Sequence, residues 1–275
     1  MSDLQQPNLR RTSGPDEGEQ RRTLNRLWPL VSIGTLAAVT VIWWLLTSGL
    51  RIIRPLYFPS PEEVVTSLVT LQAALIGDAS ATLIRVIFSW LLGSTLGIVV
   101  GLAMVRSRLV YFVLTPLVEG LRPVPPIALI PFVILWFGVG DLGKIFLAAL
   151  GCFMVMAINA IVAAGNVPPV YVRAARSLGA TQNDVYRTVI LPAIVPQLVS
   201  GLRIGAALAF AIVVAAEFMG AREGIGALIM LASRTLNTPV VLLGTIVIGL
   251  EAFLIDRTIR WFSSRVTSWA ERATD

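Results

Sequence analysis

Charged side chains occur inside stretches that are otherwise strongly apolar, and their chemistry most needs an explanation. Arg85, Glu119, Arg122 and Arg203 each fall within such a stretch. A charge in the hydrocarbon region of a membrane is costly unless it is paired or hydrated. Glu119 and Arg122 are three positions apart, so on a helix they share a face and can neutralise each other. These residues therefore indicate buried ion pairs, arginines that reach the membrane interface, or the lining of a polar path.

The composition excludes several kinds of catalysis. The chain has no histidine and a single cysteine, Cys152, inside an apolar run. Imidazole base catalysis, a Ser/His/Asp triad, a disulfide and a cysteine metal site are therefore absent. No Gly-x-x-x-x-Gly-Lys-[Ser/Thr] loop occurs, so the chain has no ATPase site of its own. We expect no cofactor in this chain and no enzymatic activity.

The balance of residue types is that of an integral membrane protein. Of 275 residues, 56% are hydrophobic and 14% are charged, whereas about a quarter are charged in a typical soluble domain. The formal net charge of +6 comes from basic residues that flank apolar runs. Such residues set orientation in the membrane, so we reject nucleic acid as a partner.

Six apolar runs approach the length of about 20 residues that a membrane-spanning helix needs. They cover residues 27–50, 79–105, 109–137, 142–167, 193–219 and 239–255. The polar residues 1–26 are expected to form a disordered cytoplasmic tail, and the first run is too long for a cleaved signal peptide. We expect an all-α fold with one transmembrane domain at 27–260 and a cytoplasmic tail at 261–275.

The distribution of basic residues predicts the orientation. Arginines concentrate in the N-terminal tail, the 168–192 loop and the C-terminal segment, while few lie in the alternate loops. The positive-inside tendency then places both termini and the 168–192 loop in the cytoplasm.

A short amphipathic helix is predicted between the first two spans. Ser60 is its expected cap, Pro61 takes the first helical position, and Glu62 and Glu63 follow near the positive end of the dipole. An apolar stripe then runs to Leu75, so this helix should lie along the outer surface, packed on the bundle or facing a partner protein.

The third apolar run cannot form a continuous helix, because it contains Pro116, Pro123, Pro125, Pro126 and Pro131. Broken backbone at membrane depth occurs where it is packed in protein or lines a watery cavity, as at transport sites.

Small residues indicate close helix packing in the second run. Gly93, Gly97 and Gly101 repeat every four residues and form a ridge that lets helices approach. The ridge fits a contact within the chain and a contact with a second copy equally well.

The long polar stretch 168–192 interrupts the apolar second half of the chain. Pro168 and Pro169 end the preceding helix and allow a short one to follow. Gly179 stops that helix, and Thr181 can cap a second turn that runs until Pro192.

This stretch resembles the Glu-Ala-Ala (EAA) loop of ABC importer permeases. The motif has an EAA triplet, then three residues, then a glycine, and it ends in Ile-x-Leu-Pro. The chain matches it at Ala174, Ala175, Gly179, Leu191 and Pro192, with Ile190 directly before Leu191 and Arg173 in place of the usual glutamate. In the family this loop is the coupling helix, which docks on the cytoplasmic ATPase. The resemblance implies ATPase-coupling roles for Arg173, Ala174, Ala175, Ser177, Leu178, Gly179 and Ala180. The alternative is an amphipathic connector on the lipid surface.

Further stretches resemble the taurine, alkanesulfonate and nitrate branch of these permeases, and its taurine members most. They are Arg122-Pro123-Val124-Pro125-Pro126, Gly201-Leu202-Arg203-Ile204-Gly205, Ala215-Ala216-Glu217 and Gly224-Ile225-Gly226. The resemblance implies a type I importer permease in the bacterial inner membrane, acting as a homodimer. Two ATPase subunits would bind ATP and Mg, and an external binding protein would deliver the solute.

The resemblance also suggests where a solute would pass. Translocation-pathway candidates are Glu119, Arg122, Pro123, Pro125, Pro126, Arg203 and Glu217. Arg122 or Arg203 would give the path a positive lining that suits a small anion, such as taurine, another sulfonate, nitrate or an aromatic acid. The alternative for each charge is a structural ion pair, and Glu217 fits packing or gating better than ligand binding.

A second class of function stays open, an ion-gradient-driven secondary transporter. Its coupling carboxylates would be Glu119 and Glu251. A membrane enzyme is disfavoured because histidine is absent and no carboxylate cluster faces one site.

Overall fold

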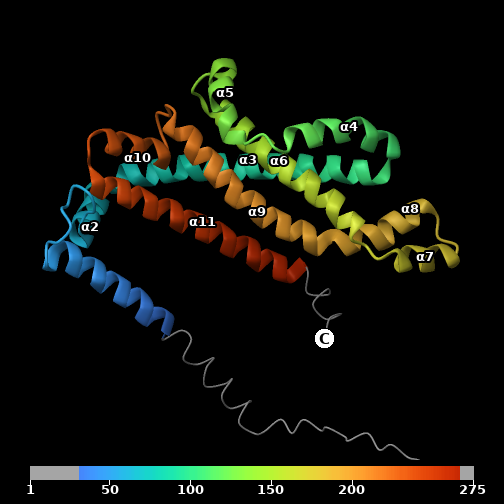
Figure 1. The fold of residues 1–275 in the computed structure, drawn as a ribbon, viewed down its shortest axis with the longest axis horizontal. Coiled ribbons are helices and arrows are strands. Elements are labelled where there is room, and N and C mark those ends of the chain that lie inside the picture. Colours follow the sequence, from blue (N-terminus) through green and yellow to red (C-terminus); the bar gives the residue numbers. More distant parts are fainter. Residues whose placement is uncertain (1–30, 267–275) are drawn as a thin grey trace, which may run out of the picture. The chain divides into compact units, whose positions relative to one another are not determined.

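The computed structural model describes residues 31–266, and within that range the regular elements are all helical. A first apolar helix covers Val31–Gly49 and ends in a π-helical turn. The remaining elements follow in this order (Figure 1): α2 (Pro61–Thr70), α3 (Gln72–Arg106), α4 (Arg108–Leu121), η2 (Pro126–Leu129), α5 (Ile130–Phe137), α6 (Asp141–Gly165), α7 (Pro169–Ser177), α8 (Gln182–Asp184), η3 (Val185–Ile190), α9 (Leu191–Phe218), α10 (Ile225–Arg234) and α11 (Thr238–Val266).

Five helices within the described residues are long and apolar enough to cross a membrane. The pair formed by Arg108–Leu121 and Pro126–Phe137 passes the same test but is bent by 83°. Counting that pair as one span gives six, as the sequence predicted. The proline-rich third run is therefore broken, because proline removes backbone hydrogen bonds and crowds the preceding turn.

The chain divides into two compact units, residues 1–62 and 63–275. In the first unit, the indole of Trp43 donates a hydrogen bond to the carbonyl of Pro59 (2.9 Å) and packs edge-on against Phe58. The Glu62 carboxylate accepts hydrogen bonds from Trp44 and Ser48. These contacts hold the segment after the first helix against that helix's own end.

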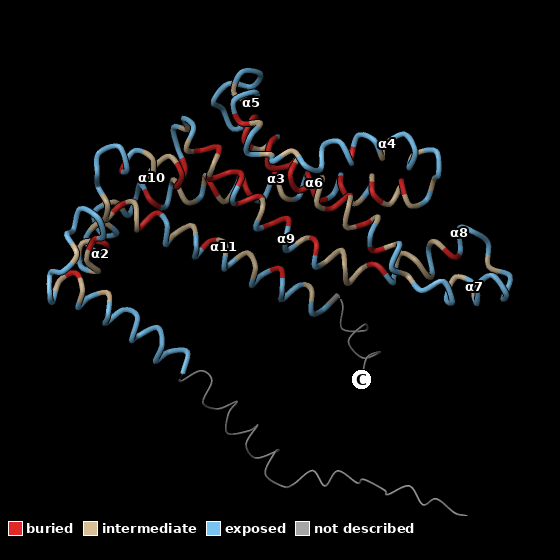
Figure 2. The backbone as a smooth tube through the Cα atoms, viewed as in Figure 1, coloured by how far each residue is buried: buried red, intermediate tan, exposed pale blue. Residues whose placement is uncertain are grey.

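The core of the second unit lies where α3, α6 and α9 pack together (Figure 2). An added Cβ at Gly93 would lie 2.1 Å from the carbonyl oxygen of Ala149, and one at Gly97 would lie 2.5 Å from that of Phe153. The glycine ridge of α3 thus packs against α6 of the same chain. This contact answers the question that the sequence left open, because both partners belong to one molecule.

Three predicted boundaries were wrong. The short helix predicted after the first span ends at Thr70, and Leu75 belongs to α3, which starts earlier than residue 79. Helical structure runs without interruption from residue 182 to Phe218, so Pro192 does not end it. Pro192 lies in the first turn of α9, directly after the π-helical turn η3, where a missing backbone donor is tolerated.

At the C-terminal end, α11 continues past Ile255 to Val266 and covers the start of the predicted tail. Its apolar face carries on through Ile259 and Phe262, which favours a longer helix. The predicted tail 1–26 and residues 267–275 lie outside the described residues.

Candidate functional site

The 168–192 loop lies at one end of the second unit, and α10 lies at the other (Figure 1). Pro168 caps α7, and Pro169 takes its first position. At the end of α7, Gly179 adopts φ +87°. The amide of Ala180 donates to the carbonyl of Ala175 (3.1 Å), and that of Gly179 to the carbonyl of Arg176 (3.0 Å). This pair of bonds is a Schellman motif, which needs glycine at the left-handed position.

The second half of the loop begins with a capping box. The Asp184 amide donates to the hydroxyl of Thr181, and the Thr181 amide donates to the carboxylate of Asp184 (2.9 Å). Tyr186 then donates its hydroxyl to the carbonyl of Leu102 on α3 (3.3 Å). The corner between the short helices is therefore fixed by local bonds and attached to the bundle.

The loop presents the seven predicted coupling residues together, on α7 and the turn after it. None of the α7 residues is buried, and the side chain of Leu178 is 89% exposed. Among the described residues, no carboxylate lies within 4.0 Å of Arg173 or Arg176. The loop thus offers an apolar residue and two uncompensated arginines on a rigid frame.

The break between α4 and η2 contains Pro123 and Pro125, and Pro126 is the first residue of η2. The amide of Val124 donates to Leu121 and that of Ala128 to Pro125, so part of the freed backbone is satisfied by turns. Glu119 and Arg122 lie 4.0 Å apart, with side chains 63% and 60% exposed. An ion pair this long and exposed contributes little to stability.

Glu217 lies at the α10 end of α9 and is 1% exposed. Its carboxylate accepts a hydrogen bond from the guanidinium of Arg85 on α3 (2.6 Å). Thr82 and the amide of Gly226 complete its contacts. Arg85 also donates to Asp141 at the start of α6 (2.8 Å). The network joins α3, α6, α9 and α10.

The turn before α10 is built around this carboxylate. Gly224 has φ +117°, and an added Cβ there would lie 2.4 Å from Glu217 Oε1. The amide of Gly224 donates to Asp78 (2.8 Å), and that of Ile225 donates to Thr82 (2.9 Å). The positive end of α10 is thus satisfied by oxygens of α3 and α9, of which those of Thr82 and Glu217 are buried.

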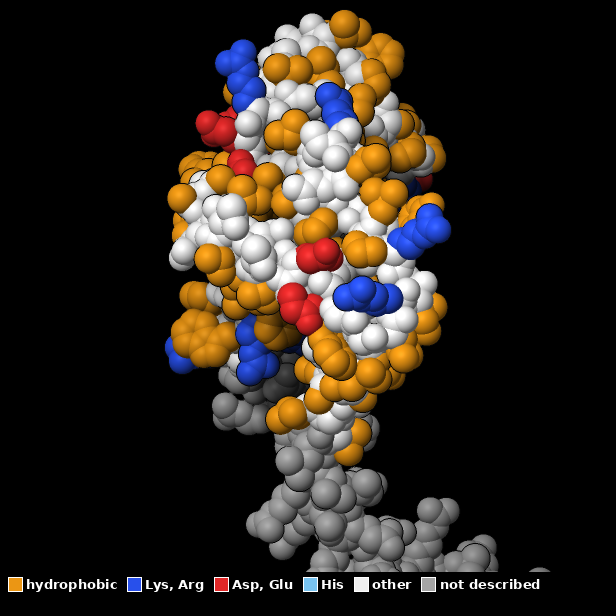
Figure 3. Space-filling view, turned by 90° about the vertical axis from the view of Figure 1, so that its left-hand side faces the viewer, with side chains coloured by type: hydrophobic (Ala, Val, Ile, Leu, Met, Phe, Trp, Pro, Cys, Tyr) orange, Lys and Arg blue, Asp and Glu red, His pale blue; other side chains and the backbone are white. Residues whose placement is uncertain are grey.

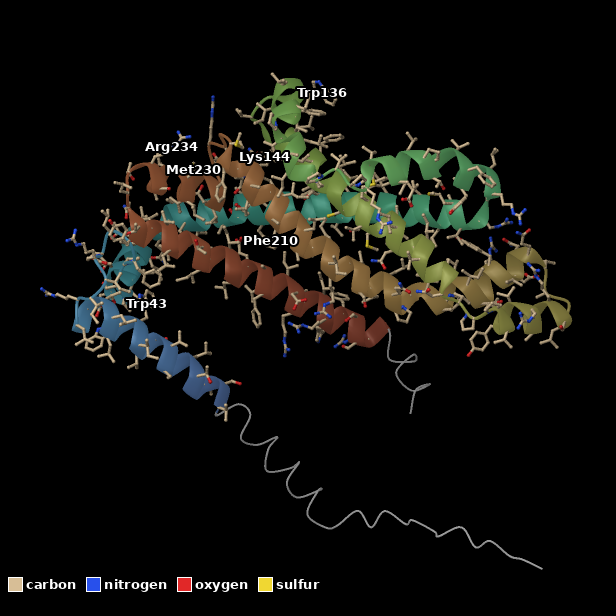
Figure 4. The ribbon with its side chains drawn as sticks, in the orientation of Figure 1. Trp43, Trp136, Lys144, Phe210, Met230 and Arg234 are labelled. Carbon is tan, nitrogen blue, oxygen red and sulfur yellow. The ribbon has the colours of Figure 1, made fainter. Side chains whose placement is uncertain are left out.

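Beside this network is a cavity of about 320 Å³ lined by charged residues, including Lys144, Arg222 and Glu223. Lys144 is buried and lies 3.2 Å from Asp141. Figure 4 shows that Lys144, Met230 and Arg234 all lie toward the α10 end of the second unit. On the face drawn in Figure 3, hydrophobic side chains predominate and charged ones are scattered among them.

Arg203, another predicted pathway residue, has a close ion-pair partner, whereas Arg122 does not. Its guanidinium donates to Asp256 on α11 (3.0 Å), and Asp256 also pairs with Arg260. Arg203 is therefore neutralised within the second unit, unlike Arg122, whose pairing is weak.

Sequence reasoning placed Arg85 and Glu217 in membrane spans but did not pair them, and it missed Thr82 and Asp141. Arg85 and Glu217 are 132 positions apart, so no local spacing joins them. Within the described range, no group of three or more His, Cys, Asp or Glu side chains is arranged to hold a metal ion.

Comparisons with known proteins show the family to which the chain belongs. Residues 93–268 match the family described as "Binding-protein-dependent transport system inner membrane component". The chain is 38% identical over 260 residues to the taurine transport system permease protein TauC of Escherichia coli K12, covering 90% of this chain and 94% of the relative. It is 31% identical over 236 residues to a putative aliphatic sulfonates transport permease protein, SsuC of Bacillus subtilis, covering 85% and 86%.

A structural comparison supports the same fold. A chain of the MetNI methionine ABC transporter, in an inward-facing conformation, superposes with a TM-score of 0.55 at 23% identity. The match covers 70% of this chain and 97% of the other. The chain therefore belongs to the binding-protein-dependent family of ABC importer permeases, in the branch that contains taurine and sulfonate permeases.

Proposed function

We propose that this chain is the membrane-spanning subunit of an ATP-driven importer, and that the 168–192 loop receives the motion of the ATPase subunits. The observation that carries this proposal is the rigid loop itself, which holds exposed Leu178, Arg173 and Arg176 beyond the bundle. A loop that is fixed by a Schellman motif and a capping box moves as one body when a partner displaces it.

The helix α9 would carry the movement of the loop across the membrane. Helical structure continues from residue 182 to Phe218, so it connects the loop directly to the Arg85–Glu217 network at the α10 end. We expect ATP and Mg to be bound by two partner ATPases. Their closure would move the loops of two permease copies together, and α9 would carry that movement toward the opposite membrane face.

The assembly in the bacterial inner membrane follows from this mechanism. The loop and both termini face the cytoplasm, where ATPases are available, and the α10 end faces outward. A solute-loaded binding protein docks at that outer end, and two copies of the chain enclose the pathway.

The solute carries a small anionic group, and taurine, a zwitterion whose sulfonate is that group, or another organosulfonate comes first. The printed names of the relatives support this class. The arrangement around the proline break also supports it, because Arg122 is exposed and weakly paired there. Glu119, Pro123, Pro125 and Pro126 accompany it at this break. Nitrate and aromatic acids are the alternative solutes.

Glu217 and Arg203 are less suited to contact the solute directly, because each is already held in an ion pair. Glu217 is buried against Arg85, and Arg203 is paired with Asp256. We assign Glu217 to holding the outer end of α9 and Arg203 to the contact between α9 and α11.

The test is uptake by vesicles that contain the chain and its cognate ATPase, with ATP and the cognate binding protein added separately. Labelled taurine should enter only when ATP and the binding protein are both supplied, and collapse of the ion gradients should leave the rate unchanged. Uptake that continues without ATP and stops with the gradients would identify a secondary transporter and overturn the proposal.

A further inference from the structure

The second unit contains a large cavity away from the loop and from the proline break. It has a volume of about 650 Å³ and lies between α3, α9 and α11. Its walls are almost entirely apolar, formed by residues that include Leu83, Trp90, Leu202, Ile255 and Phe262. Such a volume accommodates a small organic molecule, and apolar walls favour an apolar body.

One charged residue, Glu251, also lines this cavity. It is only 8% exposed, and its Oε2 atom has no hydrogen-bond partner within the structure that is described. An ionised carboxylate that is buried without a partner is expensive, since neither water nor a counter-charge stabilises it. The position therefore calls for a positively charged or hydrogen-bond-donating group.

The neighbouring charges do not supply that group. Arg85 is bonded to Glu217 and Asp141, and Lys144 is bonded to Asp141. These two cations are matched by two carboxylates. On α11, Asp256 forms ion pairs with both Arg203 and Arg260. Asp256 with its two arginines carries one net positive charge, but among the described residues neither arginine lies within 4.0 Å of Glu251, so Glu251 has no counter-charge in contact.

Trp90 makes the cavity better suited to a cation. Its indole N–H is used in a hydrogen bond to the carbonyl of Leu202 (2.9 Å), so the ring has only its aromatic surface to offer to a ligand. The face of an indole attracts organic cations, most strongly where water is excluded.

We propose that the cavity between α3, α9 and α11 is a binding site for an apolar organic amine, with its ammonium group on Glu251 and its hydrocarbon part against the apolar walls. An anion would be repelled by Glu251. A purely hydrocarbon occupant would leave the carboxylate without a partner. The proposal goes beyond the transport function and does not depend on it.

The test compares three probes of nearly equal size on the full chain in lipid nanodiscs. They are cyclohexylmethylamine, cyclohexylmethanol and cyclohexanecarboxylate, with saturable binding measured by calorimetry. The amine should bind at least tenfold more tightly than the alcohol, and the carboxylate should show no saturable binding. Equal binding of the amine and the alcohol would overturn the proposal.

Two variants separate this site from general partition into lipid. Glu251→Gln keeps the side-chain volume and should abolish the preference for the amine, whereas Glu63→Gln, which removes a carboxylate on α2, should retain it. An amine preference that survives in Glu251→Gln would contradict the assignment. Failure of all three probes to bind would indicate that a helix of this chain or of a second copy fills the cavity, and would overturn it as well.

Discussion

The guanidinium of Arg85 and the carboxylate of Glu217 form a buried ion pair of 2.6 Å that joins α3 to the end of α9. Both side chains are almost completely excluded from solvent. The same carboxylate accepts the Gly226 amide at the start of α10. A buried pair with its remaining oxygens satisfied can hold a unique arrangement even where its net contribution to stability is small.

Removing one partner of this pair should be costly. Arg85→Ala leaves Glu217 buried without its cation, so we expect the free energy of unfolding to fall by about 3–5 kcal/mol. Denaturant unfolding of the purified chain in detergent measures this loss. The double variant Arg85→Ala with Glu217→Gln removes both charges and should recover part of it, and Glu217→Gln alone completes the comparison. A double variant as unstable as the sum of the two single variants would show that the two residues do not interact.

The glycine ridge should tolerate no side chain at Gly93. Gly93→Ala places a Cβ against the backbone of Ala149, and we expect a loss of about 1–3 kcal/mol from overpacking. Gly77→Ala, also on α3, is the matched control, because a Cβ there would meet nothing within 4 Å. It should be neutral or slightly stabilising. Thermal unfolding of both variants compares them, and equal midpoints would exclude the α3–α6 contact.

Acid should loosen the segment that follows the first helix. Hydrogen bonds from its own backbone amide and from the Ser48 hydroxyl hold the pKa of Glu62 below its ordinary value. A lowered pKa stabilises the folded form above the ordinary value of 4.5, and this stabilisation is lost as pH falls through the lower folded value.

The fluorescence of Trp44, whose indole donates to Glu62 (2.6 Å), should report this change. We expect an acid transition in the native chain and none in Glu62→Gln. A variant that titrates like the native chain would assign the transition to another carboxylate.

Arg122 should affect transport without affecting stability. Its pairing with Glu119 is long and exposed, so Arg122→Gln should change the free energy of unfolding by less than about 1 kcal/mol. If Arg122 lines the pathway, the rate of anion uptake at limiting solute should fall by about tenfold, equivalent to about 1.4 kcal/mol. Vesicle uptake measures this effect. An unchanged rate in a stable variant would remove Arg122 from the pathway.

Local features of the fold were predictable from the sequence, because their causes are local. Prolines 123, 125 and 126 specify the break in the third span, and Thr181 with Asp184 specifies a capping box within four residues. Gly179 specifies the left-handed corner of the loop. The limit lay at Pro192, where the sequence suggests a stop but a π-helical turn lets the helix continue.

Long-range relationships were not predictable in the same way. The pairs Arg85–Glu217 and Arg203–Asp256 join residues that are 132 and 53 positions apart, and only the packing of α3, α9 and α11 brings them together. The sequence could not identify the helix that packs on the glycine ridge either, because small residues permit the close approach of any helix. The sequence identified Glu251 as an unusual carboxylate, but its cavity is formed by three separate helices.

The central claim is that the 168–192 loop couples this chain to an ATPase, and isolation of the native assembly tests it most directly. The chain should co-purify from native membranes with an ATP-hydrolysing subunit in equal amount. Gly179→Val should lose that subunit while the chain itself stays folded, because valine is strained at φ +87°. Gly77→Val, a control on α3 away from the loop, should retain it. A native chain that arrives folded and without an ATPase would contradict the account.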